Sequence, residues 1–157
     1  MIWRDSVLGA RDSWLVKTRK LYMEIKDFRD LKVWNLGKKL VLDVYVLSKR
    51  FPKHEIFGLT SQMRRAGISI PSNIAEGFNR HYKKEYIRFL YLALGSCAEL
   101  ETQTEIAFEL LYMSDRDKEK LLEDIAHESR MLRALIKKLV NNSSFTSPEP
   151  QAPSTEK

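Results

Sequence analysis

Apolar residues at helical spacing are the pattern that most limits what this chain can fold into. Across residues 28–141 they recur at alternating intervals of three and four, as on one face of an amphipathic helix. The pattern falls into four blocks, namely residues 30–50, 54–78, 83–112 and 114–141. No stretch shows the period of two that marks a strand. Four amphipathic helices joined by short loops predict an all-α, up-down-up-down antiparallel four-helix bundle.

Local signals mark where these helices begin, end and bend. Pro52 ends the first block, because proline disfavours a helical residue before it. Ser114 precedes Asp117 by three residues, which resembles a capping box and predicts the start of the last helix. Pro71 lies inside the second block, where it removes a backbone hydrogen bond. We therefore expect the second helix to be kinked near Pro71, or else to be divided into two shorter helices.

Composition divides the 157 residues into three parts. Residues 26–141 form the predicted four-helix bundle. Residues 142–157 are rich in Ser, Thr and Pro and predict a disordered tail. Residues 1–25 carry two tryptophans but no matching helical stripe. They are either an N-terminal arm that packs on a neighbour, or an upstream extension of a protein whose authentic start is Met23.

Several function classes are disfavoured by residues that the chain lacks. No window approaches the ~20 apolar residues of a membrane-spanning helix. Charges interrupt the first 20 residues where a signal peptide would be apolar, so we expect a cytoplasmic protein without a membrane partner. Cys97 is the only cysteine, and His54, His81 and His127 fall in different blocks. We therefore expect no metal site, no cofactor, no catalytic residues and no enzyme activity.

Polar residues and glycines within the helical blocks have a structural interpretation. Helical bundles use polar side chains beside their core to fix the register of the helices. We expect Gln62, Arg65, Asn73 and Glu76 to fix the register by forming hydrogen bonds across helices. We also expect Gly77 and Gly95 to permit close helix approach or to end a helix.

Four motifs distributed over residues 28–139 carry a family resemblance. They are Phe28-x-x-Leu31-x-x-Trp34, Phe51-Pro52-x-x-Glu55-x-Phe57-Gly58-Leu59-x-x-Gln62-x-Arg64-Arg65-Ala66, Ser69-Ile70-Pro71-Ser72-Asn73-Ile74-Ala75-Glu76-Gly77 and Phe89-Leu90-x-x-Ala93-x-Gly95-Ser96-x-x-Glu99. In these motifs the chain resembles the 23S rRNA intervening sequence proteins, which are bacterial four-helix bundles. Their relatives include the accessory variability determinant of diversity-generating retroelements, a homopentamer that binds nucleic acid and a reverse transcriptase. The resemblance implies a homopentamer with a nucleic-acid partner.

An antiparallel bundle would separate the charges of this chain between its two ends. The start of the first helix, the end of the second, the start of the third and the end of the fourth share one end. This basic end collects 11 Lys and Arg residues against five acidic residues, whereas the opposite, acidic end has six against nine. A cyclic assembly would place several basic ends on one rim, where their fields add and attract a polyanion.

The residues expected to bind nucleic acid follow from this charge separation. The first choices are Arg29, Lys32, Arg80, Lys83, Lys84, Arg88, Arg133 and Lys137. Arg64 and Arg65 are second choices, because one of the two is expected to face another helix. Phe78, Tyr82 and Tyr86 lie near the basic cluster and could stack on unpaired bases, although Tyr86 also fits the core pattern.

A second apolar stripe exceeds what the core of one bundle requires. Its members are Trp34, Val41, Tyr45, Leu94 and Ile106, and we expect them at an oligomer interface. The sequence thus predicts a non-enzymatic homo-oligomer that binds structured RNA, or other nucleic acid, through a basic rim. One alternative is an adaptor whose oligomer docks a protein such as a reverse transcriptase. Another is a remnant of a mobile or intervening element without a selected activity.

Overall fold

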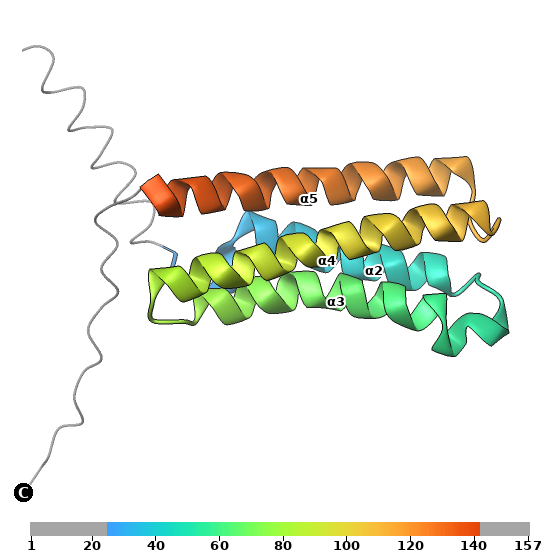
Figure 1. Cartoon of the computed structure of the whole chain (residues 1–157), viewed down its shortest axis with the longest axis horizontal. Helices are drawn as coiled ribbons and strands as arrows, with labels where there is room; N and C mark the ends of the chain where they lie inside the picture. Colours follow the sequence, from blue (N-terminus) through green and yellow to red (C-terminus); the bar gives the residue numbers. More distant parts are fainter. Residues whose placement is uncertain (1–24, 142–157) are drawn as a thin grey trace, which may run out of the picture.

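Four long helices run side by side in residues 25–141, the part of the chain that the computed structural model describes (Figure 1). They are α2 (Lys32–Ser48), α3 (Leu59–Phe78), α4 (Lys83–Glu109) and α5 (Asp115–Asn141). Two 3-10 helices, η1 (Phe28–Asp30) and η2 (Lys53–Phe57), precede α2 and α3. No strand occurs in this part of the chain, so the all-α prediction is confirmed. The arm and tail predicted for residues 1–25 and 142–157 fall, except for Ile25, outside the described residues.

The helices pack in chain order and close into a ring. Each helix contacts the next one along the chain, and α5 returns to contact α2. The short connections make neighbouring helices antiparallel, which confirms the up-down-up-down topology (Figure 1). The predicted stripe of α2 faces inward, with Val33, Leu40 and Val44 buried in the core. None of the helices within residues 25–141 has the length and apolarity needed to cross a membrane.

The second predicted helix differs from the structure at its start. Residues 53–57 form η2 instead of the first turn of α3, and the side chain of Ile56 is exposed although the heptad pattern places it in the core. The helix begins at Leu59, where Oε2 of Glu55 accepts a hydrogen bond of 2.8 Å from the backbone N–H. From there α3 runs unbroken through Pro71, so the alternative of two shorter helices is wrong. The kink near Pro71 stays a prediction.

The last helix begins where its capping signal predicts. The backbone N–H of Asp117 donates to Oγ of Ser114 over 3.2 Å, and that hydroxyl donates to the Asp117 carboxylate over 2.9 Å. Arg50, which follows α2, also pairs with Asp117 at 2.9 Å. The bond from Ser114, together with that from Arg50, holds the pKa of Asp117 below its usual value despite partial burial.

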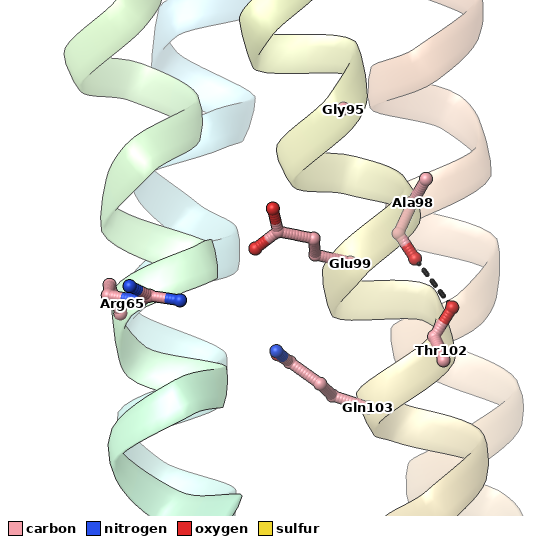
Figure 2. A pocket seen from close by; sticks show the side chains of 6 residues that line it. All are labelled: Arg65, Gly95, Ala98, Glu99, Thr102 and Gln103. Atoms are coloured by element: carbon pink, nitrogen blue, oxygen red, sulfur yellow. Dashed lines mark hydrogen bonds between the residues drawn. The ribbon is translucent and has the colours of Figure 1, made fainter.

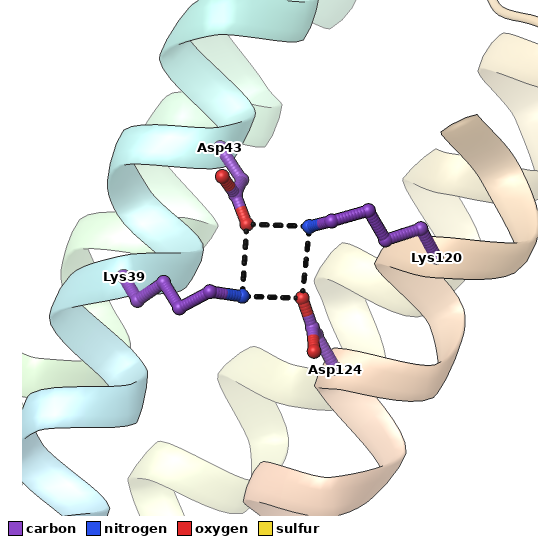
Figure 3. A network of polar contacts seen from close by, with 4 residues as sticks. All are labelled: Lys39, Asp43, Lys120 and Asp124. Carbon is purple, nitrogen blue, oxygen red and sulfur yellow. Dashed lines mark hydrogen bonds and ion pairs between the residues drawn. The ribbon is translucent and has the colours of Figure 1, made fainter. Parts of the chain in front are cut away.

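A square of charged side chains fastens the first helix of the bundle to the last (Figure 3). Lys39 of α2 lies 2.7 Å from Asp124 of α5, and Lys120 of α5 lies 3.0 Å from Asp43 of α2. Each lysine also reaches the aspartate four residues away on its own helix, at 3.3 and 3.1 Å. Every charge in the square therefore has two opposite neighbours.

One carboxyl group lies inside the core without a partner among the described residues. Glu128 of α5 is fully buried, and neither of its side-chain oxygens has a hydrogen-bond partner there. Burial raises the pKa of this carboxyl to about 8. Glu128 is one of the five acidic residues counted at the basic end from the sequence, and this assignment is wrong because the side chain does not reach the surface.

The polar contacts between α3 and α4 differ from those expected. Oγ of Ser96 on α4 donates to Oγ of Ser69 on α3 over 2.9 Å. The Asn73 side chain adds a bond to the same Ser69 hydroxyl, but within its own helix. Glu76 is exposed and pairs with Arg80 at the end of α3. Gln62 and Arg65 are exposed as well, so two serines make the cross-helix bond that the larger residues were expected to make.

Candidate nucleic-acid interface

The topology gathers four separate segments of the chain at the basic end, on the left in Figure 1. These segments are η1 with the start of α2, the turn from α3 to α4, the start of α4, and the end of α5. All eight first-choice residues lie on them, namely Arg29, Lys32, Arg80, Lys83, Lys84, Arg88, Arg133 and Lys137. Residues more than 100 positions apart in the sequence thus lie at one end of the bundle.

The arginines near the α3–α4 turn are positioned by an aromatic ring. The guanidinium carbons of Arg80 and Arg88 lie 5.0 and 5.5 Å from the ring centroid of Phe89. Arg80 also pairs with Glu76, and Arg88 lies 3.4 Å from Glu85. Cation–π contacts and ion pairs hold these long side chains in place while leaving about half or more of each exposed.

Arg29 is held in a similar way in η1, just before α2. Its guanidinium lies 4.6 Å from the centroid of Phe28 and 2.8 Å from the Asp27 carboxylate. The same carboxylate accepts a bond from the backbone N–H of Arg29, and this bond is the main cause that lowers the pKa of Asp27. The Arg29 side chain remains largely exposed.

Four other cations of this end form no ion pair with the acidic residues that the structure describes. Lys32, Lys84, Arg133 and Lys137 are exposed, and within residues 25–141 none of them forms an ion pair. Lys83 is half-buried. Unpaired surface cations keep their full charge available to a phosphate, and each one bound to a phosphate releases counterions from the nucleic acid.

Only one of the three expected aromatic side chains faces solvent. Tyr82, directly before α4, is 74% exposed and lies between the basic residues of the turn. Tyr86 is buried and packs edge-on against the ring of Phe78, with 6.1 Å between centroids. Tyr82 therefore offers a ring face on which a base could stack, whereas Tyr86 and Phe78 belong to the fold.

The second-choice arginines lie in the half of α3 away from the basic end. Nε of Arg64 donates to Oγ of Ser48 over 2.9 Å, and its guanidinium lies 4.7 Å from the ring of Tyr45. Of the two, Arg64 is thus the one that contacts a neighbouring helix, α2. The structure does not bring either arginine together with the first-choice residues.

Arg65 lines a hollow of about 500 Å³ between α3 and α4 (Figure 2). Glu99 and Gln103 project into it from α4, while Gly95 and Ala98 line it on the same helix (Figure 2). Within residues 25–141 Arg65 and Glu99 make no ion pair.

The residues expected at an oligomer interface are partly covered within the protomer. Trp34 packs edge-on against Phe28, 5.2 Å away, and the ammonium group of Lys38 lies over its ring at 4.8 Å. Val41 and Leu94 are half-buried, whereas Tyr45 and Ile106 are exposed. Other exposed apolar side chains lie outside the predicted stripe: Leu42 and Val46 on α2, Ile68 on α3, and Tyr91 and Leu92 on α4.

No metal-binding arrangement occurs among residues 25–141. The His, Cys, Asp and Glu side chains of this part form no group of three that could hold an ion. Cys97 is buried, and desolvation raises the pKa of its thiol to about 12, so it stays protonated and unreactive at neutral pH.

Comparisons with known proteins agree with the bundle. The sequence model of the 23S rRNA-intervening sequence protein family matches residues 29–134. A crystal structure of a protein of unknown function from the S23 ribosomal protein family of Bacteroides thetaiotaomicron has a similar fold, with a TM-score of 0.63 and 24% sequence identity. The similarity covers 67% of this chain and 98% of that one. None of the curated proteins is significantly similar to this chain.

Proposed function

Because this chain belongs to the family of 23S rRNA-intervening sequence proteins, we propose that it is a non-enzymatic protein that binds nucleic acid, structured RNA first, through its basic end. The observation that carries the proposal is the set of exposed cations without acidic partners among the described residues, contributed by α2, α4 and α5. Lys32, Lys84 and Lys137 represent the three helices. Tyr82 adds a stacking surface for an unpaired base.

A homo-oligomer is part of the proposal, with a pentamer as the family resemblance implies. Exposed apolar side chains on outer helix faces support self-association, notably Leu42 and Val46 on α2. In a ring each protomer would add its basic end to one rim, so that several weak phosphate contacts act together. Native mass spectrometry of the full chain tests the subunit number. A cytoplasmic, bacterial setting belongs to the same proposal.

Charge reversal at the basic end tests the interface. A triple variant, Lys84→Glu, Arg133→Glu and Lys137→Glu, changes only exposed side chains that have no ion pair within residues 25–141. The matched control, Lys49→Glu with Lys53→Glu and Arg116→Glu, also reverses three exposed charges but places the acidic groups at the opposite end. Fluorescence anisotropy with an RNA hairpin and with single-stranded DNA should show binding lost in the triple variant and retained in the control.

The salt dependence of binding gives a second readout. Neutralising one phosphate contact changes the log-log salt slope by about 0.9 on duplex DNA and about 0.7 on single strands. Lys84→Ala and Lys137→Ala should each reduce the slope by about this amount. Failure of the unmodified protein to bind either ligand at low salt would contradict the proposal.

The alternative function is an adaptor whose oligomer docks another protein, such as a reverse transcriptase. In that case the triple variant would leave nucleic-acid affinity unchanged, or only the complex with the protein would bind nucleic acid. Unchanged RNA binding with an intact oligomer would therefore favour the adaptor.

A further inference from the structure

Two large apolar side chains are almost fully exposed at the acidic end of the bundle, on the right in Figure 1. Phe57, the last residue of η2, is 91% exposed, and Leu111, in the α4–α5 connection, is 88% exposed. Ile56 and Leu110, their preceding neighbours, are also exposed. We call these four residues the apolar corner. Their side chains add little to the core, so the stability of the bundle does not explain them.

The backbone at Leu111 gives the second observation. Leu111 has a φ of 61°, and among residues 25–141 it is the only non-glycine with a positive φ. Its N–H donates to the carbonyl of Phe108 and the next N–H, of Tyr112, donates to that of Ala107, as in a Schellman motif. Glycine usually occupies this left-handed position because a side chain costs free energy there. The chain thus keeps a leucine where glycine would suit the fold better.

A single carboxylate ties the two halves of the apolar corner together. Oε1 of Glu55 accepts a hydrogen bond of 3.1 Å from the hydroxyl of Tyr112, the residue after Leu111. Oε2 of Glu55 accepts from the backbone N–H of Leu59, two residues after Phe57. The rings of Tyr112 and Phe51 pack together as well, with 5.4 Å between centroids. The exposed side chains are therefore presented from a fixed backbone.

The charges around Leu111 indicate what kind of partner fits. Residues 105–119 contain five acidic and two basic residues. One of the basic residues, Lys118, pairs with Glu105 at 2.8 Å. Glu109, Asp115 and Glu119 are exposed and form no ion pair within the described residues. These carboxylates repel a phosphate backbone and attract Lys and Arg.

We propose that the apolar corner docks a short segment of a partner protein in which apolar side chains are flanked by lysine or arginine. Phe57 and Leu111 bury against the apolar side chains of the segment, and the carboxylates beside Leu111 pair with its cations. Protein interfaces commonly combine a buried apolar side chain at the centre with complementary charges at the rim, and this segment would supply both. This surface is separate from the basic end, and its occupation does not depend on nucleic acid.

The experiment uses the full chain and a fluorescein-labelled synthetic peptide of leucine and lysine at amphipathic helical spacing. A second peptide replaces every leucine by serine and keeps the charge. We expect the leucine peptide to bind roughly tenfold or more tightly than the serine peptide. Equal affinity for the two peptides, or no binding of either, would overturn the proposal, since charge alone or nothing at all would then be recognised.

The variant Leu111→Gly separates docking from folding. It removes the exposed side chain and relieves the left-handed backbone, so thermal stability should stay equal or rise while affinity for the leucine peptide falls roughly tenfold. Phe57→Ser should have the same effect on binding, and RNA binding should not change in either variant. If both variants bind the peptide like the parent, the apolar corner is not the docking site. Concentration-dependent self-association that Leu111→Gly abolishes would assign the surface to a second copy of the chain instead.

Discussion

Oε1 of Glu128 on α5 lies 3.4 Å from the point that a Cβ atom of residue 37 on α2 would occupy, so Gly37 provides the room in which this carboxyl is buried. The same point lies 3.2 Å from Cγ2 of Ile70 on α3. Three helices therefore enclose the carboxyl, and no hydrogen-bond donor among the described residues reaches it. The side chain stays protonated at neutral pH, because its pKa is about 8.

The stability of the bundle should fall as the pH rises through the neutral range. Below pH 4.5 Glu128 is protonated in both the folded and the unfolded chain. Between pH 4.5 and about 8 the unfolded chain releases the proton while the folded chain retains it, so folding loses about 1.4 kcal/mol for each pH unit. Above a pH of about 8 the loss ends. Urea unfolding at several pH values between these two limits measures the slope.

The variant Glu128→Gln assigns this slope to one residue. Its amide does not titrate, so the fall in unfolding free energy over the neutral range should largely disappear, while the titration of other groups is common to both proteins. Glu128→Leu should be more stable than the parent at the upper end of the range, because an apolar side chain does not ionise on unfolding. A parent and a Gln variant with the same pH dependence would contradict the assignment.

Two glycines should respond to alanine substitution in opposite directions. A Cβ at Gly77 would lie 2.7 Å from Cβ of Phe89 and 3.2 Å from the backbone oxygen of Tyr86, so α3 and α4 would have to separate. We expect Gly77→Ala to destabilise by about 1 to 3 kcal/mol. Gly95 is the matched control: no atom lies within 4 Å of its added Cβ, and Gly95→Ala should stabilise by roughly 0.5 to 1 kcal/mol. Thermal unfolding of both variants would show the sign, and a loss of stability in both would refute the distinction.

Removing the exposed ring at the basic end should weaken binding to unpaired bases selectively. Tyr82→Ala is expected to cost about 1 to 3 kcal/mol with single-stranded DNA or a loop-containing RNA, and much less with a fully paired duplex. Tyr91, exposed on α4, serves as the control for loss of a surface tyrosine. Anisotropy titrations of both variants with the three ligands test this, and equal losses on duplex and single strand would argue against stacking.

The charged square between α2 and α5 should contribute modestly and in a salt-dependent way. Although partial burial opposes it, hydrogen bonds from Lys39 and Lys120 keep the pKa of Asp124 below its usual value. The contribution of Asp124 to the stability of the bundle is therefore fully present above pH 3.8 and is lost as the pH falls through the lowered pKa of this residue. Since the lysines are half-exposed, we expect Asp124→Asn to cost only about 1 kcal/mol, and less in high salt.

A second ion pair on α5 provides the comparison. Arg130 and Glu123 lie 2.8 Å apart, but both side chains are more than half exposed and belong to the same helix. Glu123→Gln should leave the unfolding free energy nearly unchanged. Denaturant unfolding at low and high salt compares Asp124→Asn with Glu123→Gln. Equal changes in unfolding free energy would mean that the link between α2 and α5 adds nothing.

The helices can be predicted well from the sequence because their apolar spacing and caps are local signals. Ser114 predicts the start of α5 directly, and the stripe through Leu40 and Val44 predicts the buried face of α2. The start of α3 cannot be predicted in this way, because the heptad pattern continues through Ile56 while the Glu55 carboxylate caps the helix only at Leu59. That bond is visible only once the chain is folded.

The candidate surfaces also differ in how far they can be predicted from the sequence. The basic end follows from topology and charge, so its residues can be identified from the sequence. The burial of Glu128 cannot be predicted from the sequence, because it depends on the space that Gly37 leaves on another helix. The exposure of Leu111 cannot be predicted either. The apolar spacing places this residue on a helical face, and no neighbouring residue type indicates the left-handed backbone that exposes its side chain.

Ile25 and Asn141, the first and last described residues, both lie at the basic end, whereas only internal connections form the acidic end (Figure 1). A fusion partner or affinity tag joined directly to either of these residues therefore emerges beside Lys32 and Lys137 and crowds the surface proposed to hold nucleic acid. A tag at either terminus of the bundle therefore affects the basic end and leaves the acidic end free. Immobilising the bundle through such a tag leaves Phe57 and Leu111 on the side away from the support, so a binding screen performed in that orientation favours ligands of the acidic end over ligands of the basic end.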